Sequence, residues 1–361
     1  GIQNILKNLM FAQIKKFKAD GGAGIIMNAN NGKIQAIVSL PDYNNNNING
    51  LSKEQLFNKA TKGVYELGST LKIFTAAMAI ESGILKDNDL IDVSSPIKLA
   101  RSQTINDTKK ITFPINLPEV IVYSSNIGTA KIADRLGHNL QNKYFNLLGF
   151  SKKIQLEIVE ISKPRINNNV SISSIMTKSY GYGIQITPLH LTKATAIVLN
   201  GGTYLNPTLL NRHNNYKKNL KVFTTNTSKK IRSMLYLVVN NKNGTGKKAK
   251  NFDYPIGGKT GTAYKVIDGK YSSSDKIVAF TGGFPINKPE YVFTIIIDNP
   301  QPQKFSHNLA TGGWVVAPIV TKLIDRIAPI LGVNPNNIDI ENLNLENYKI
   351  RDRKANLWYV V

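Results

Sequence analysis

Apolar positions recur along this chain at two spacings, one typical of helices and one typical of strands. Residues 3–19 place apolar side chains at helical intervals and end before Gly21-Gly22, so they predict a helix. Two short apolar runs, 23–27 and 34–38, flank Asn30-Asn31-Gly32, a strong signal for the tight turn of a β-hairpin. The first forty residues therefore predict a helix followed by two antiparallel strands.

The middle of the chain has helical spacing interrupted by glycine and proline. No helix breaker occurs from Ser69 to Ser82, and Gly83 stands where a left-handed C-terminal cap is expected, so this stretch predicts a helix. Three more helices are expected at similar signals: a short one that begins near Pro118, one over residues 128–136 with Gly137 after it, and one over residues 188–199 with Thr187 as its N-cap.

The final third is rich in strand-like segments. Strands are expected over residues 258–266, 277–284 and 291–298, and helical spacing returns over 314–331. This order predicts an α+β domain whose central antiparallel sheet pairs the early hairpin with the late strands and is flanked by helices. We expect one domain over residues 1–333, with an inserted helical lobe at about 84–175, and a polar C-terminal tail over 334–361.

Basic residues exceed acidic ones, 46 against 23, which gives a net charge of +23. They are spread along the chain without a nucleic-acid-binding motif, so we favour compositional drift over a polyanion partner and expect no nucleic acid to bind. The absence of cysteine excludes disulfides and a thiolate nucleophile, and the four histidines are scattered, so we expect neither a metal nor a cofactor. No apolar run approaches the roughly 18–20 residues that span a bilayer.

The first candidate for chemistry is the tetrad Ser69-Thr70-Leu71-Lys72. On a helix this spacing places serine and lysine one turn apart on one face, where a lysine of lowered pKa can take the serine proton. The same spacing begins at Ser95 and at Ser273, so the tetrad alone is also compatible with an ordinary helix cap. Ser69 differs from the other two because glycine precedes it and an apolar helix follows it.

The second candidate is Ser124-Ser125-Asn126, expected between two short helices. A hydroxyl and an amide two residues apart on a tight loop could relay a proton and orient a substrate amide. A turn with local side-chain caps is the alternative, and the segment that begins at Ser306 has the same spacing.

The third candidate is Lys259-Thr260-Gly261-Thr262, and its Lys-Thr-Gly occurs once in the chain. A phosphate-binding loop would need glycine where Asp253 stands and a helix afterwards, whereas the segment that follows looks extended. On an edge strand, small Gly261 would instead let a ligand backbone approach closely. Lys259, Thr260 and Thr262 would then face an anionic group.

Together, in this order, the three elements are the set shared by β-lactamases and penicillin-binding proteins. The surrounding sequence, from about residue 20 to 332, resembles class B penicillin-binding proteins, most of all the septal, division-specific transpeptidases, with elongation-type enzymes second. Family members often have proline where Leu67 stands. The segments that carry the resemblance are residues 37–43, 64–72 (Val-Tyr-Glu-Leu-Gly-Ser-Thr-Leu-Lys), 123–131 (Tyr-Ser-Ser-Asn-Ile-Gly-Thr-Ala-Lys), 180–188, 257–263 and 313–318.

The resemblance implies the penicillin-binding transpeptidase fold, which is like that of serine β-lactamases, and no cofactor. It also implies a membrane anchor and a pedestal domain ahead of this chain, and a start at Gly1 rather than methionine is consistent with a missing N-terminus. The catalytic domain would then lie in the periplasm, anchored in the cytoplasmic membrane, beside a polytopic glycan polymerase and other divisome proteins.

The implied reaction is peptidoglycan D,D-transpeptidation. Ser69 would attack the penultimate D-alanine of a stem pentapeptide, an amine of an acceptor stem peptide would take the acyl group, and β-lactam antibiotics would acylate the same serine. By position, the resemblance implies that Lys72 is the general base and that Ser124 relays a proton. Asn126 would bind the donor peptide, Lys259 would provide a positive potential, and Thr260 and Thr262 beside Gly261 would bind the carboxylate. The backbone N–H groups of Ser69 and Thr262 would form the oxyanion hole.

Other activities remain as alternatives. A class A β-lactamase needs a Glu-x-x-x-Asn loop, and neither Glu157 nor Glu160 has asparagine four residues later. A D,D-carboxypeptidase would use water as the acceptor. A penicillin-binding sensor would need signalling segments beyond this sequence, and the intact motif residues argue against an inert divisome scaffold.

Overall fold

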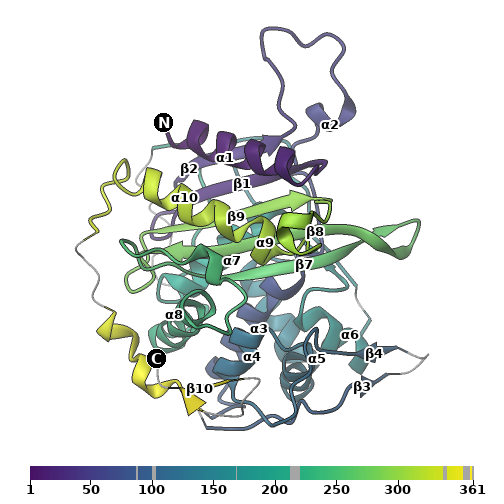
Figure 1. Ribbon diagram of the computed structural model, residues 1–361, viewed down its shortest axis with the longest axis vertical. Helices are drawn as coiled ribbons and strands as arrows, with labels where there is room; N and C mark the ends of the chain where they lie inside the picture. The colour runs from purple at the N-terminus through teal and green to yellow at the C-terminus, as the bar shows by residue number, and fades with distance from the viewer. Residues whose placement is uncertain are drawn as a thin grey trace.

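The structure, a computed structural model, describes residues 1–86, 88–99, 103–167, 169–211, 220–335, 340–352 and 358–359. At its centre lies an antiparallel sheet of five strands in the order β2-β1-β9-β8-β7, with helices on both faces (Figure 1). The strands are β1 (Gly21–Asn28), β2 (Ile34–Leu40), β7 (Gly257–Ile267), β8 (Lys270–Phe284) and β9 (Tyr291–Asp298). The early hairpin does pair with the late strands, and the predicted α+β class is confirmed.

Burial along the strands explains their places in the sheet. Central β9 is buried at every residue, which matches its continuous apolar run, whereas edge strand β2 alternates buried and half-exposed residues. β8 begins at Lys270, earlier than the expected start at residue 277, because its polar first residues pair with the end of β7. This β7–β8 arm reaches out beyond the rest of the sheet (Figure 1).

Two hydrophobic clusters cover the two faces of the sheet. Helices α1 (Ile2–Lys16), α9 (Gly312–Val315) and α10 (Ala317–Ile327) pack on one face, and α3 (Lys72–Glu81), α7 (Pro188–Leu199) and α8 (Thr225–Asn240) contribute to the cluster on the other. Helix α7 has the predicted bounds and the predicted N-cap at Thr187. The helical spacing noted over 314–331 corresponds to two helices, α9 and α10.

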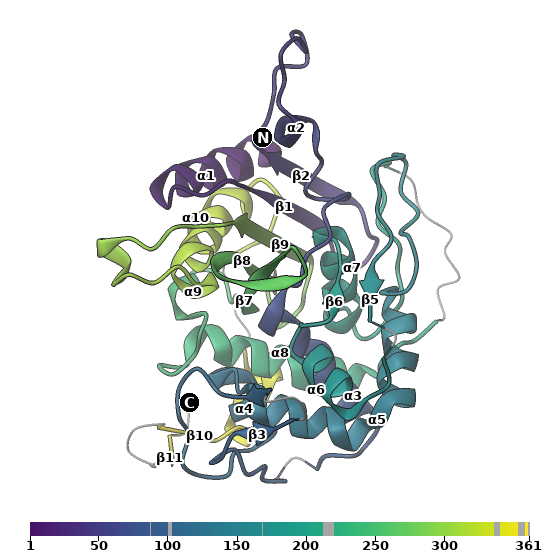
Figure 2. The ribbon, with the colours of Figure 1, turned by 90° about the vertical axis from the view of Figure 1, so that its right-hand side faces the viewer.

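Below the sheet, helices α4 (Leu117–Tyr123), α5 (Asn126–Leu148) and α6 (Ile172–Ser179) gather beside α3 and α8 (Figure 2). The helix expected over residues 128–136 begins at Asn126, and its helical backbone stops at Gly137, whose dihedrals are not helical. The chain kinks at Gly137, which adopts a φ of 72°, and then continues as helix to Leu148. Most of these helices fall in the proposed lobe, and the division into lobe, domain and tail stays a prediction.

Short elements complete the fold: α2 (Lys53–Leu56), the 3-10 turns η1 (Gly68–Leu71), η2 (Lys247–Ala249), η3 (Lys304–Ser306), η4 (Glu341–Leu343) and η5 (Leu345–Asn347), and the paired strands β3 (Ile97–Lys98) with β4 (Thr104–Ile105), β5 (Arg165–Ile166) with β6 (Ile184–Gln185), and β10 (Ile350–Arg351) with β11 (Trp358–Tyr359). Within the described part of the tail, Ile350 is completely buried, so this segment packs back onto the domain. No helix among the described residues is long and apolar enough to cross a membrane.

Candidate active site

Ser69 lies in the tight turn η1, directly before helix α3, which begins at Lys72. The glycines around it permit very close backbone approaches. A Cβ built on Gly68, whose φ is 53°, would lie 2.6 Å from the carbonyl oxygen of Thr262 in β7. A Cβ on Gly181 would lie 2.2 Å from the carbonyl oxygen of Gly68. The turn that carries Ser69 is therefore held between strand β7 and the loop at Gly181.

Lys72 is completely buried one turn after Ser69. Its Nζ donates to the carbonyl oxygen of Ser124 at 2.6 Å, to Oδ1 of Asn126 at 2.7 Å and to Oγ of Ser124 at 3.2 Å. Burial lowers the pKa of Lys72 to about 7, and the charge of Asp107 opposes part of that effect. A large fraction of Lys72 is therefore a free amine near neutral pH, the form that can accept a proton.

Ser124 connects the two lysines of the site. It follows the last residue of α4 and adopts left-handed dihedrals, φ 61° and ψ 44°, which are uncommon for a residue with a side chain. While its carbonyl oxygen and hydroxyl accept from Lys72, its Oγ also accepts from Nζ of Lys259 at 2.8 Å. One serine is thus bonded to both amines.

Lys259 is also completely buried, on strand β7. Burial and the nearby charge of Lys72 lower its pKa well below the usual lysine value. Thr245 contacts both Lys259 and its neighbour on the strand. Nζ of Lys259 lies 3.5 Å from the Thr245 hydroxyl, and the Thr260 hydroxyl donates to the same oxygen at 2.9 Å. Thr245 therefore fixes two of the predicted site residues of β7, although no sequence motif singled it out.

Strand β7 forms one edge of the sheet and faces the Ser69 turn. A Cβ on Gly261 would lie 2.3 Å from the carbonyl oxygen of Leu67, so only glycine fits this approach. Thr262 is half-exposed, and its hydroxyl accepts from the backbone N–H of Gly312 at 3.2 Å. The edge position predicted for the Lys-Thr-Gly segment is confirmed.

Asp107 is a further residue that sequence reasoning missed. Its carboxylate accepts from the Ser125 hydroxyl at 2.7 Å and from the backbone N–H groups of Asn126 at 2.5 Å and Ile127 at 3.1 Å. It thereby satisfies free N–H groups at the start of α5 and holds the loop that carries Ser124.

The serines with matching spacing elsewhere lie in different settings. Ser95 and Ser273 are exposed, and Ser306 is buried with its hydroxyl bonded to the carbonyl oxygen of Gln303 at 2.9 Å. The carboxylate of Glu157 is bonded to the Thr208 hydroxyl at 2.5 Å. Within the described ranges, no group of three or more acidic or histidine side chains is arranged to hold a metal ion.

The family described as penicillin binding protein transpeptidase domain matches residues 22–325. The chain belongs to this family. That match includes the Ser69 turn, the Ser124 loop and strand β7, the three parts that the fold brings together.

Similar proteins carry related names. The probable peptidoglycan D,D-transpeptidase FtsI of Caulobacter vibrioides is 33% identical over 340 residues, which are 92% of this chain and 58% of that protein. Stage V sporulation protein D of Bacillus subtilis is 31% identical, over 98% of this chain and 55% of that protein. The transpeptidase domain of penicillin-binding protein 3 from Burkholderia pseudomallei has a TM-score of 0.81 at 25% identity, with 93% of this chain and 96% of that one covered. The chain spans little more than half the length of these two curated relatives.

Proposed function

We propose that this chain is the catalytic domain of a peptidoglycan D,D-transpeptidase that cross-links stem peptides during septal wall synthesis. The observation that carries the proposal is the buried pair Lys72 and Lys259, both bonded to Ser124. Lys72 lies one turn after Ser69, and Lys259 lies on strand β7, which faces the Ser69 turn. Two buried lysines joined by one hydroxyl are expensive to maintain for stability alone, and such groups are typical of catalytic sites.

In the proposed reaction, Oγ of Ser69 attacks the carbonyl carbon of the penultimate D-alanine while its proton moves to Nζ of Lys72. Backbone N–H groups of Ser69 and Thr262 stabilise the oxyanion, and loss of one such donor typically costs about 2.7–4 kcal/mol of transition-state stabilisation. The amide C–N bond then breaks, and Ser124 passes a proton to the departing D-alanine nitrogen. An amine of the acceptor stem attacks the resulting ester and frees Ser69.

Substrate-binding roles are proposed for residues around the same site. The amide of Asn126 orients the donor peptide, and Thr260 and Thr262 receive its terminal carboxylate in the positive potential of Lys259. Gly261 lets the peptide backbone lie close to the edge of β7. β-Lactams would occupy this place and acylate Ser69.

The Glu-x-x-x-Asn loop of class A β-lactamases, which would activate a water against that acyl group, is missing at Glu157 and Glu160. Glu157, one of the two glutamates considered for activating a water, is engaged with Thr208. We therefore infer slow deacylation of a penicillin adduct. Rapid turnover of nitrocefin would contradict this inference and favour a β-lactamase.

The deciding experiment is labelling of the purified chain with a fluorescent penicillin, followed by peptide mass spectrometry. We expect one adduct, on the peptide that contains Ser69, and none in Ser69→Ala. Ser95→Ala is the matched control, because that exposed serine has the same spacing to a lysine and should label like the wild type. A folded wild-type chain without an adduct at Ser69 would refute the proposal.

The acceptor is tested separately with a pentapeptide thioester donor, with and without a D-amino acid. Transfer to the amine supports a transpeptidase, whereas hydrolysis alone would favour a D,D-carboxypeptidase. We also propose a periplasmic location at the cytoplasmic membrane, an anchor ahead of this chain, and a polytopic glycan polymerase as partner. Depletion of the native protein should give filaments if the role is septal and rounded cells if it is elongation-type.

A further inference from the structure

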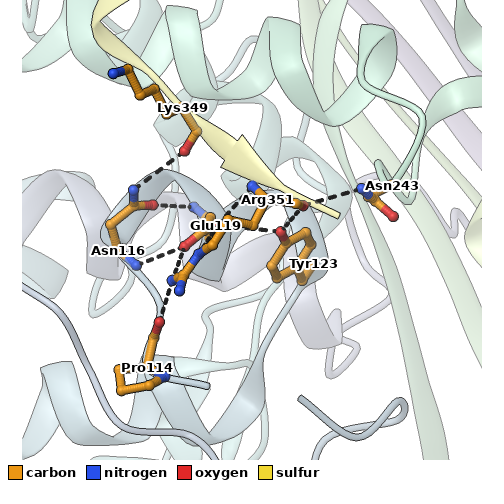
Figure 3. Close-up of polar contacts among 7 residues, drawn as sticks. All are labelled: Pro114, Asn116, Glu119, Tyr123, Asn243, Lys349 and Arg351. Carbon is orange, nitrogen blue, oxygen red and sulfur yellow. Dashed lines mark hydrogen bonds and ion pairs between the residues drawn. The ribbon is translucent and has the colours of Figure 1, made fainter. Parts of the chain in front are cut away.

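The described end of the chain packs against the helix that leads to Ser124. Strand β10 contacts α4, and the side chain of Arg351 points into a polar cluster around Glu119 of that helix (Figure 3). The side chains of Arg351 and Glu119 are 8% and 0% exposed. A residue from the far C-terminus thus forms a buried ion pair with α4.

The carboxylate of Glu119 receives a set of donors that specifies arginine. Nε of Arg351 lies 3.1 Å from Oε1, one terminal guanidinium nitrogen lies 2.9 Å from Oε2, and the backbone N–H of Arg351 donates to Oε1 at 2.9 Å. The guanidinium also stacks 4.2 Å from the ring centre of Phe113 and donates to the carbonyl oxygen of Pro114. A lysine at 351 would supply the charge without the planar fork.

The backbone carbonyl of Arg351 joins two parts of the domain. It accepts from the hydroxyl of Tyr123, the last residue of α4, and from Nδ2 of Asn243 at 3.3 Å (Figure 3). Ser124 directly follows Tyr123. Thr245, which supports Lys259, stands two residues after Asn243.

We propose that Arg351 is a positioning residue for the reaction: by its bonds to Glu119, Tyr123 and Asn243 it holds the Ser124 loop at a fixed distance from the support of β7. The inference rests on the proposed function, because it concerns the same site. Arg351 touches neither amine. It acts through the two backbone segments that hold them.

Two physical arguments favour positioning over simple stabilisation. A buried ion pair gains little net stability, because the cost of removing both charges from water offsets their attraction, whereas its geometry is strict. Ser124 also needs support, since a side-chain-bearing residue in the left-handed region is strained and relaxes unless its neighbours hold it. Tyr123, held through its hydroxyl, is the neighbour on one side, and Ser125, held by Asp107, is the neighbour on the other.

The test measures penicillin acylation by stopped flow, which separates the initial binding constant from the acylation rate constant. In Arg351→Gln we expect the acylation rate constant to fall about tenfold or more, because small misplacements of catalytic groups carry large rate penalties. Arg351→Lys should recover only part of the loss. The matched control is Lys349→Ala, an exposed side chain two residues away, which should acylate like the wild type.

A second variant guards against misfolding. Tyr123→Phe keeps the ring and removes the hydroxyl that binds the Arg351 carbonyl, so it should also slow acylation while its circular dichroism matches the wild type. A merely structural role would lower the fraction of protein that labels and leave the rate constant of the labelled fraction unchanged.

The two proposals fail in different ways. If the wild type forms no adduct at Ser69, the proposed function is wrong. If the wild type labels, and either folded Arg351→Gln or folded Tyr123→Phe labels at the wild-type rate constant, the positioning role of Arg351 is wrong.

Discussion

Replacement of Lys72 by arginine tests whether its lowered pKa is used for catalysis. At pH 7, a lysine with its usual pKa of 10.5 is a free amine in only about 0.03% of molecules, whereas a pKa of about 7 makes the free amine about half of the population. Burial thus raises the concentration of the base by about three orders of magnitude. Arginine keeps the positive charge and stays protonated at every accessible pH, so Lys72→Arg removes the base while it preserves the charge.

The assay is the second-order rate constant for penicillin acylation as a function of pH. For the wild type we expect it to rise with pH through a midpoint near 7, because Lys72 must be deprotonated to act. For Lys72→Arg we expect a profile without this rise and a rate about 10²–10⁴-fold lower, the usual contribution of a general base. Acylation by Lys72→Arg within about tenfold of the wild type would refute the reasoning, as would a wild-type profile that is flat from about pH 5.5 to about 8.5.

Three other changes have definite expected outcomes. Asp107→Asn should shift the acylation midpoint to lower pH, because the carboxylate charge raises the pKa of Lys72, and the same pH profile would measure it. Gly261→Ala should lose most penicillin labelling, because the new Cβ would lie 2.3 Å from the carbonyl oxygen of Leu67; wild-type labelling by the folded variant would contradict the close approach. Burial lowers the pKa of His190 from 6.5 to about 4. As pH falls through this range, the imidazole becomes protonated in the unfolded chain but stays neutral in the folded one, so the free energy of unfolding decreases. Urea unfolding should show that the wild type loses more stability over that pH range than His190→Gln, by roughly 3 kcal/mol at most; equal losses would contradict the assignment.

Elements with strong local signals were predicted well from the sequence. Helix α7 has a threonine N-cap and a proline in its first turn, and β9 is a continuous apolar run, so both have the expected bounds. The errors occur where tertiary pairing outweighs local pattern. The polar start of β8 is a strand only because β7 pairs with it, and a second helical segment follows the kink at Gly137 within α5.

The sequence singled out motif residues that the fold brings together, and it missed the residues that support them. Each motif residue stands in a pattern of a few neighbouring positions, which can be found in one sequence. Asp107, Thr245 and Arg351 contact the site or its helix across 15 to 232 positions of sequence, and no local pattern marks them. The composition of the tail is polar, which does not predict burial. Arg351 is nevertheless buried, because it forms an ion pair with the buried side chain of Glu119.

The joint position of the two lysines limits how the site can carry charge. If both were protonated, two cations would share one buried hydroxyl, and the lowered pKa of Lys259 reflects burial together with that cost, whereas burial lowers the pKa of Lys72. With one proton fewer, Ser124 can accept from the charged amine and donate to the neutral one. Both contacts to this hydroxyl already exist, at 3.2 and 2.8 Å, so a proton transfer between Lys72 and Lys259 through Ser124 would need no rearrangement of heavy atoms. Under the proposed mechanism, the proton taken from Ser69 reaches the leaving nitrogen through Ser124, which is bonded to both amines. This role accounts for a serine held in the strained left-handed conformation at this position.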